Sequence, residues 1–99
     1  MPEPGEGLLL GGETDRDWLT VVVDYLSPLG YKMYAAEDNV KQFLESTAKN
    51  NVAIEKITLP EDKVMLRQAF EKYDIRGVFN LAKARAKDVS DVNYIMSKL

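Results

Sequence analysis

The turn from Ala35 to Asn39 is the first place where residue types suggest chemistry. It follows an apolar run, GYKMY, and precedes a helical pattern, KQFLE. A turn of this kind can hold a phosphate on the free N–H groups of the helix. Here the acidic residues Glu37 and Asp38 can occupy that end themselves, and Asp caps helices well. We therefore favour a turn capped by Asp38 over a phosphate site, although Asn39 is still a donor for an anion.

Concentrated positive charge follows the last apolar run. Asn80 ends that run, and Lys83, Arg85 and Lys87 come next with no acidic residue before Asp88. Such cations can bind an anionic ligand, or they can form a solvated basic loop, because Lys and Arg normally lie outside. The sequence leaves both interpretations open.

A third candidate lies near the N-terminus, where Gly11 and Gly12 precede Thr14. These residues could cradle an anion at the start of a helix. A lone Gly-Gly pair is more typical of an ordinary strand-to-helix turn, which is the interpretation that we favour.

The composition excludes several kinds of chemistry. The chain has no Cys and no His, so it has no disulfide, no thiolate and no histidine general base or metal ligand. We expect no cofactor and no metal. A net charge of −3 argues against binding to nucleic acid or to an anionic membrane. No apolar run approaches the roughly 20 residues of a membrane span.

The length of 99 residues suits one domain. Residues 1–6, rich in Pro, Gly and Glu, are expected to be a flexible leader, and residues 7–99 a single domain. Apolar patterns predict strands at 7–10, 31–35, 53–59 and 77–81. Helical patterns lie between them and after the last, near residues 14–27, 38–51, 61–73 and 89–99.

This alternation predicts a three-layer α/β fold, an open and mainly parallel sheet flanked by helices. In the helix at 61–73 we expect Val64, Met65, Ala69 and Tyr73 to face inward. Ser90 or Asp91 is the expected cap of the last helix. Open parallel sheets bind ligands at the carboxyl edge of their strands. The loops at that edge are residues 11–15, 36–39, 60–62 and 80–88.

Two long stretches resemble a known family. LGYKMYAAEDNVKQFLE and YDIRGVFNLAKARAKDVSDVNYIMSK are similar, in order and spacing, to the methylglyoxal-synthase-like domain. The resemblance is strongest to the allosteric C-terminal domain of carbamoyl-phosphate synthetases and covers about residues 7–99. It implies a flavodoxin-like architecture, from which the family's last strand and helix would be missing.

The chain also departs from that family. The family's Thr-Glu-Gly-Thr turn becomes Ala36-Glu37-Asp38-Asn39, which removes both hydroxyls and adds a carboxylate that repels phosphate. Two consecutive arginines of the family are replaced by Ser97 and Lys98. Lys98 keeps one positive charge but cannot make the paired hydrogen bonds of an arginine guanidinium. The enzyme's Gly-Gly-Asp motif and its His are missing, so we expect no methylglyoxal synthase activity.

The resemblance implies a noncatalytic regulatory domain. It would bind a small anionic metabolite, a nucleotide or an acylated amino acid, and modulate an attached or partner synthetase. The alternative is a protein–protein assembly module that has lost the ligand site. The candidate ligand-binding residues are Thr14, Glu37, Asn39, Asn80, Lys83, Arg85 and Lys98. We expect a cytoplasmic location, with an organelle as the alternative. Ser97-Lys98-Leu99 matches a peroxisomal address only if it is a native C-terminus.

Overall fold

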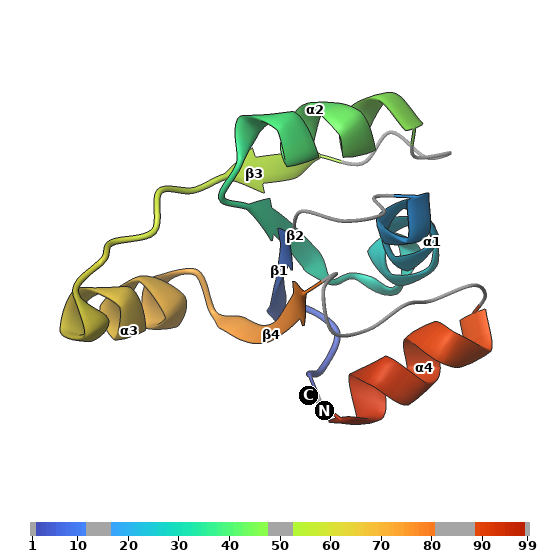
Figure 1. Ribbon diagram of the computed structural model, residues 1–99. Helices are drawn as coiled ribbons and strands as arrows, with labels where there is room; N and C mark the ends of the chain where they lie inside the picture. Colours follow the sequence, from blue (N-terminus) through green and yellow to red (C-terminus); the bar gives the residue numbers. More distant parts are fainter. Residues whose placement is uncertain (1, 12–16, 48–52, 81–88, 99) are drawn as a thin grey trace.

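Strands and helices alternate along the chain, as the sequence predicts (Figure 1). The structure, a computed structural model, describes residues 2–11, 17–47, 53–80 and 89–98. In chain order the elements are β1 (Gly7–Gly11), α1 (Asp17–Leu26), the 3-10 turn η1 (Ser27–Leu29), β2 (Lys32–Ala35), α2 (Asp38–Thr47), β3 (Ile54–Lys56), α3 (Lys63–Lys72), β4 (Ile75–Asn80) and α4 (Val89–Lys98).

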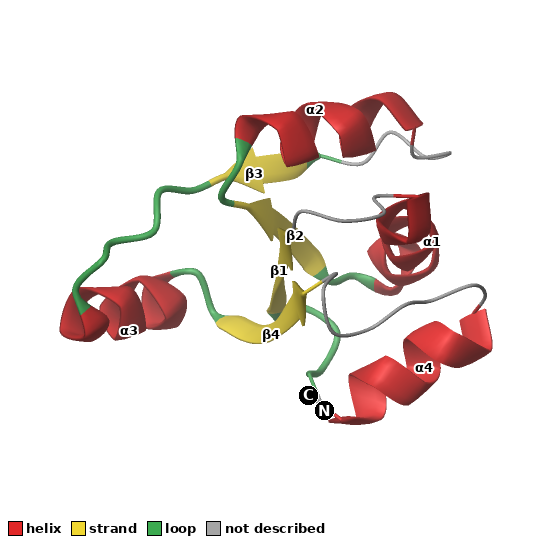
Figure 2. Cartoon of the chain, viewed as in Figure 1, coloured by secondary structure: helices red, strands yellow, loops and turns green. Residues whose placement is uncertain are grey.

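The strands form one sheet with parallel pairing throughout. Within the described residues its order is β3-β2-β1-β4. Leu9 lies opposite Tyr34 on one side and Val78 on the other, so β1 is paired along both of its edges. Helices cover both faces of the sheet (Figure 2). The predicted fold class, a parallel sheet flanked by helices, is confirmed.

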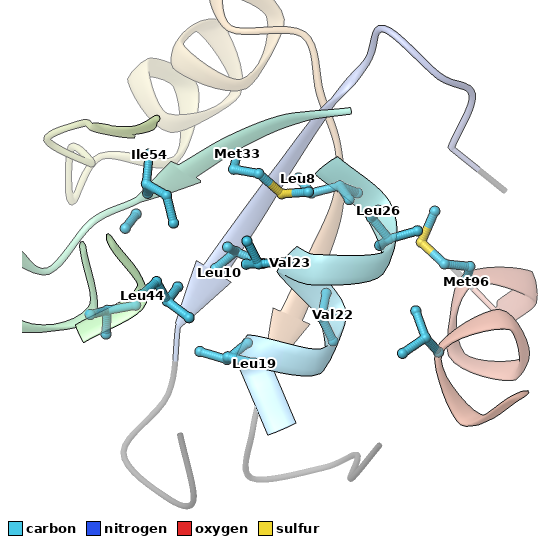
Figure 3. Packing of buried hydrophobic residues seen from close by; sticks show 13 residues of the cluster. Leu8, Leu10, Leu19, Val22, Val23, Leu26, Met33, Leu44, Ile54 and Met96 are labelled. Atoms are coloured by element: carbon cyan, nitrogen blue, oxygen red, sulfur yellow. The ribbon is translucent and has the colours of Figure 1, made fainter. Parts of the chain in front are cut away.

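The larger core lies on the face covered by α1, α2 and α4. Successive side chains of a strand point to opposite faces, and Leu8 and Leu10 of β1 both point to this one. Figure 3 shows them facing Leu19, Val22, Val23 and Leu26 of α1. The remaining buried residues of this cluster are Met33, Ala35, Val40, Leu44, Ile54, Val92 and Met96.

The smaller core lies on the opposite face, under α3. Its buried residues are Leu9, Tyr34, Ile57 and Ile75, and partly buried Leu59, Phe70 and Tyr73 pack against them. The rings of Tyr34 and Tyr73 are tilted, with centroids 5.4 Å apart. Burial, more than the nearby Glu55 carboxylate, raises the pKa of the Tyr34 phenol. The phenol is therefore neutral at physiological pH.

Local signals in the sequence explain where two helices begin and end. The carboxylate of Asp62 caps α3 by accepting hydrogen bonds from the N–H groups of Val64 and Met65, each at 3.0 Å. After α1, Pro28 lies in η1, and Gly30 follows with a φ of 101° that favours glycine. This turn redirects the chain into β2.

The inward face predicted for α3 is wrong at its first turn. Val64 and Met65 are 66% and 56% exposed, whereas Ala69 and Tyr73 are half-buried as expected. Leu66, Ala69, Phe70 and Tyr73 follow the i, i+3, i+4, i+7 spacing of one helix face, and this face, not Val64 and Met65, is turned to the sheet.

Two strand boundaries differ from the prediction by two residues or more, and the predicted cap of α4 is wrong. The third strand ends at Lys56 instead of residue 59, because its partner β2 ends at Ala35, opposite Lys56. The fourth strand begins at Ile75 instead of residue 77, because Ile75 pairs with Gly7. Ser90 and Asp91 lie inside α4, which begins at Val89, and so neither occupies the cap position.

The predicted leader makes specific contacts in its described part, residues 2–6. Gly5 N–H donates to the Gly30 carbonyl at 3.1 Å, and the Glu6 carbonyl accepts from Lys32 N–H at 3.0 Å. The Tyr31 hydroxyl donates to the Pro2 carbonyl at 2.9 Å. Burial, followed by the charges of Glu3 and Glu6, raises the pKa of this tyrosine. These bonds place the segment beside the amino end of β2.

The unequal burial along the helices predicts unequal mutational effects. Leu44→Ala removes a fully buried side chain of α2 and should lower the free energy of unfolding by about 2–5 kcal/mol. Val64→Ala trims an exposed side chain of α3 and should change it by no more than about 0.5 kcal/mol. Urea denaturation measures both. Similar losses in the two variants would contradict the described packing.

Candidate functional site at the carboxyl edge of the sheet

The carboxyl ends of all the described strands meet at one edge. Ala35 lies opposite Leu10 in β1 and Lys56 in β3, while Asn80 lies opposite Gly11. Because the strands are parallel, the loops that follow them leave the sheet on the same side. This edge is where open α/β sheets bind ligands.

The turn after β2 brings two predicted residues to this edge. Ala36 and Glu37 form the turn, and Asp38 is the first residue of α2. The side-chain oxygen of Asn39 accepts from Val40 N–H at 2.9 Å, and Lys41 N–H already donates to the Glu37 carbonyl at 3.2 Å. The bond from Lys41 is the first ordinary hydrogen bond of the helix, so Val40 N–H is the one donor of the helix start that these two bonds remove from an anion. Fewer free donors are left for an anion than in an uncapped turn.

The predicted capping role of Asp38 is wrong in its geometry. Asp38 lies one position past the cap, and its side chain is 79% exposed. Its recorded partner among the described residues is Lys56, with Oδ1 and Nζ 3.7 Å apart. Asp38 therefore acts on α2 through its charge near the positive end of the helix. Its hydrogen-bonding role is taken by Asn39.

Lys56 is a residue that sequence reasoning missed. With a strand predicted over 53–59, Lys56 lies inside the strand. Because β3 ends at Lys56, this residue instead lies at the carboxyl edge, beside the start of α2, with 32% of its side chain exposed. The signal available in the sequence is weak: one lysine, next to one glutamate, in a run that is otherwise rich in β-branched residues.

The other predicted site residues divide into two groups. Asn80 ends β4 at the same edge, with β1 between it and the turn after β2, so Glu37, Asn39 and Asn80 share one edge. Lys98 is the last residue of α4, on the face that carries the larger core. Thr14, Lys83 and Arg85 lie outside the described residues.

The described edge carries charged and amide groups at its turn and strand ends. Across the described residues, no three His, Cys, Asp or Glu side chains come together to hold a metal ion. The same part of the chain contains no helix long and apolar enough to cross a membrane. The described edge combines a lysine, two carboxylates and an amide, which together can form charged and neutral hydrogen bonds with a small polar ligand.

Comparison with known proteins connects this chain to one enzyme. It is 61% identical over 99 residues to the "Carbamoyl phosphate synthase arginine-specific large chain, mitochondrial" of Neurospora crassa, covering 99% of the chain. The protein of the same name from Schizosaccharomyces pombe is 46% identical over 99 residues, again with 99% of the chain covered. The arginine-specific large chain of Cutaneotrichosporon cutaneum is 33% identical over 95 residues, or 95% of the chain.

The chain is homologous to part of the large chain of carbamoyl phosphate synthase. It spans 8% of the length of each of these relatives. No protein-family model matches it, and no solved structure matches it either. The relation to a synthase large chain thus rests on the curated relatives.

The contact between Asp38 and Lys56 predicts opposite effects of one substitution on stability and on anion binding. Asp38→Ala should lower the free energy of unfolding by about 0.3–1 kcal/mol, because it removes a favourable charge at the start of α2 and an exposed ion pair. It should also strengthen the binding of inorganic phosphate, because Lys56 loses a competing carboxylate.

Glu71→Ala is the matched control, because Glu71 is an exposed acidic residue near the end of α3, away from the carboxyl edge. Urea denaturation and calorimetric titration with phosphate measure the two effects. A stability loss without any change in phosphate binding would mean that Asp38 does not compete for an anion at Lys56.

Proposed function

We propose that this chain is a noncatalytic regulatory domain of a carbamoyl-phosphate-synthetase-type enzyme. It binds a small anionic metabolite, a nucleotide or an acylated amino acid, at the carboxyl edge of its sheet. Binding there modulates the catalytic part of the synthetase, which is attached to the domain or supplied by a partner subunit. The resemblance to methylglyoxal-synthase-like allosteric domains is part of this proposal.

The observation that carries the proposal is the position of Lys56 beside the start of α2. The N-terminus of α2 carries a partial positive charge from the helix dipole. The ammonium group of Lys56 adds a full positive charge, with Nζ 3.7 Å from Asp38 Oδ1. The chain thereby brings a cation and a helix N-terminus to the edge where open α/β sheets bind ligands. Homology to synthase large chains supports a role connected with that enzyme.

The ion pair between Asp38 and Lys56 also fits the alternative function, a protein–protein assembly module. Asp38 neutralises Lys56 from within the chain, so an anion must displace a carboxylate before it can pair with that lysine. A domain in which this competition prevents ligand binding would keep its fold and act as a protein–protein assembly module. Saturable binding of a metabolite distinguishes the regulatory domain from the assembly module.

The names of two relatives bear on location. The Neurospora crassa and Schizosaccharomyces pombe proteins are both named mitochondrial. These names favour the organellar alternative over the cytoplasmic location expected from the sequence. The location of this chain stays a prediction.

Ligand binding should depend on Lys56 and on the cations that follow β4 in the sequence. Charge-assisted hydrogen bonds contribute about 1.5–3 kcal/mol each. Replacing both Lys83 and Arg85 with Ala should therefore weaken metabolite binding by at least about tenfold, as should Lys56→Ala alone. Calorimetric titrations with nucleotides and with acylated amino acids, at two salt concentrations, measure the affinities.

Lys32→Ala is the control for nonspecific charge effects, since Lys32 is exposed at the amino end of β2, on the opposite edge. Its affinity should equal that of the unchanged chain. If the affinity is unchanged in the variants of Lys56, Lys83 and Arg85, the metabolite binds at another place on the domain. Absence of saturable binding by every compound would overturn the regulatory proposal and favour the assembly module.

The noncatalytic assignment predicts no turnover of dihydroxyacetone phosphate. The chain lacks His, and the segment LPEDKV stands where the enzyme carries its Gly-Gly-Asp motif. The purified chain, incubated with dihydroxyacetone phosphate at neutral pH, should release methylglyoxal no faster than buffer does. Release above that background, abolished by heat denaturation of the protein, would contradict the prediction.

A further inference from the structure

The helix α3 differs from the other described helices in how it is held. None of its 10 residues, all of which the structure describes, is buried. In contrast, α2 buries Val40 and Leu44, and α4 buries Val92 and Met96. Figure 1 shows α3 on the opposite side of the sheet from α1 and α4, joined to β3 by a long connection.

Contact between α3 and the sheet is concentrated near the end of the helix. Phe70, with Tyr73 just past the helix, packs against the smaller core, and the Tyr73 ring meets Tyr34. The first turn contributes no comparable anchor, because Val64 and Met65 are mostly exposed. The helix is thus attached at its C-terminal end and extends away from the sheet at its N-terminal end.

The segments before and after α3 also differ in regularity and in how they are attached to the sheet. On the N-terminal side, residues 57–62 have no regular secondary structure, and within them Ile57 and Leu59 contribute to the smaller core. On the C-terminal side, Asp74 has a φ of 53°, in the left-handed region that few non-glycine residues adopt. Its carbonyl accepts from Gly7 N–H at 2.7 Å, which ties this point to β1. The junction at Asp74 is thus fixed to β1, whereas Thr58 and Glu61 of the irregular connection are exposed, and this difference points to a hinge at Asp74.

We propose that α3 is a hinged strap that opens as a unit about Asp74 while the rest of the fold stays formed. Among the residues whose burial the structure describes, the smaller core buries Leu9, Tyr34, Ile57 and Ile75, whereas the larger core has 13 buried residues on the other face. Elements with few buried apolar contacts open at the low end of a protein's range of free energies. Opening uncovers Tyr34 and its apolar neighbours.

The absence of native Cys permits a direct test. Ile57→Cys places a thiol under α3, and Ile54→Cys places one under α2, on the other face of the same segment. Both isoleucines are 2% exposed. Under native conditions we expect a maleimide reagent to modify the thiol at position 57 at least about tenfold faster than the thiol at position 54. Equal rates, or a faster reaction at position 54, would overturn the strap proposal.

Hydrogen exchange on the unsubstituted chain gives a second test that does not require either variant to fold. The backbone amides of α3 should exchange at least about tenfold faster than those of α2, with a weaker dependence on urea. Phe70→Ala should accelerate exchange further in α3 alone. Phe43→Ala, which trims a partly buried aromatic residue of α2, should accelerate exchange in α2 and leave exchange in α3 unchanged, so the ratio of α3 to α2 protection should rise. Exchange of α3 and α2 at one common rate, with one urea dependence, would show that α3 opens only when the whole domain unfolds.

Discussion

The arrangement of this domain depends on the burial of β1 on both faces of the sheet. β1 pairs along both edges, and its consecutive residues Leu8, Leu9 and Leu10 alternate between the two cores. At its start, a Cβ on Gly7 would come within 2.7 Å of the Tyr34 ring and 3.0 Å of the Tyr73 carbonyl. The strand therefore needs apolar side chains at its centre and none at Gly7, where β2 and the end of α3 approach closely.

The two faces bury very different amounts of apolar surface. Burial contributes roughly 25 cal/mol per Å², so the face with α1, α2 and α4 carries most of the stabilisation. Tyr34 dominates the smaller face, where its phenol is nearly buried and stays neutral. A sheet built in this way can lose its cover on one face without losing the core on the other. This asymmetry is the physical basis for treating α3 separately from the rest of the domain.

At the carboxyl edge, the chain's own charges compete for the same partners. Asp38 lies near the start of α2 and close to Lys56, so a carboxylate already occupies the electrostatic position that an anionic ligand would take. Exposed ion pairs contribute little, about 0–1 kcal/mol, so this competition is weak enough for a multiply charged ligand to overcome. Under the proposed function, the difference between binding and not binding a ligand is therefore a small free energy at this edge.

The sequence by itself determined the order of elements and the parallel sheet. The apolar runs LLL, YKMY and VAI, separated by helical periodicity, are local patterns that strongly favour this alternation. Local chemistry also determined the start of α3, where Asp62 accepts from two backbone N–H groups, and the turn at Gly30. The placement of Glu37, Asn39 and Asn80 at one edge followed from the parallel order.

Only the tertiary structure decided the features that depend on partners distant in sequence. The end of β3 at Lys56 follows from the length of β2 and not from the β-branched residues that continue the run. The exposure of Val64 and Met65 depends on which side of α3 meets the sheet, and several apolar residues around that helix made its inward side ambiguous. Likewise, the partner of Asp38 is a lysine 18 positions later in the chain. Where a strand ends, which side of a helix meets the sheet and which charges pair are all properties of the packed chain. Each of them depends on contact between two segments that are distant in sequence.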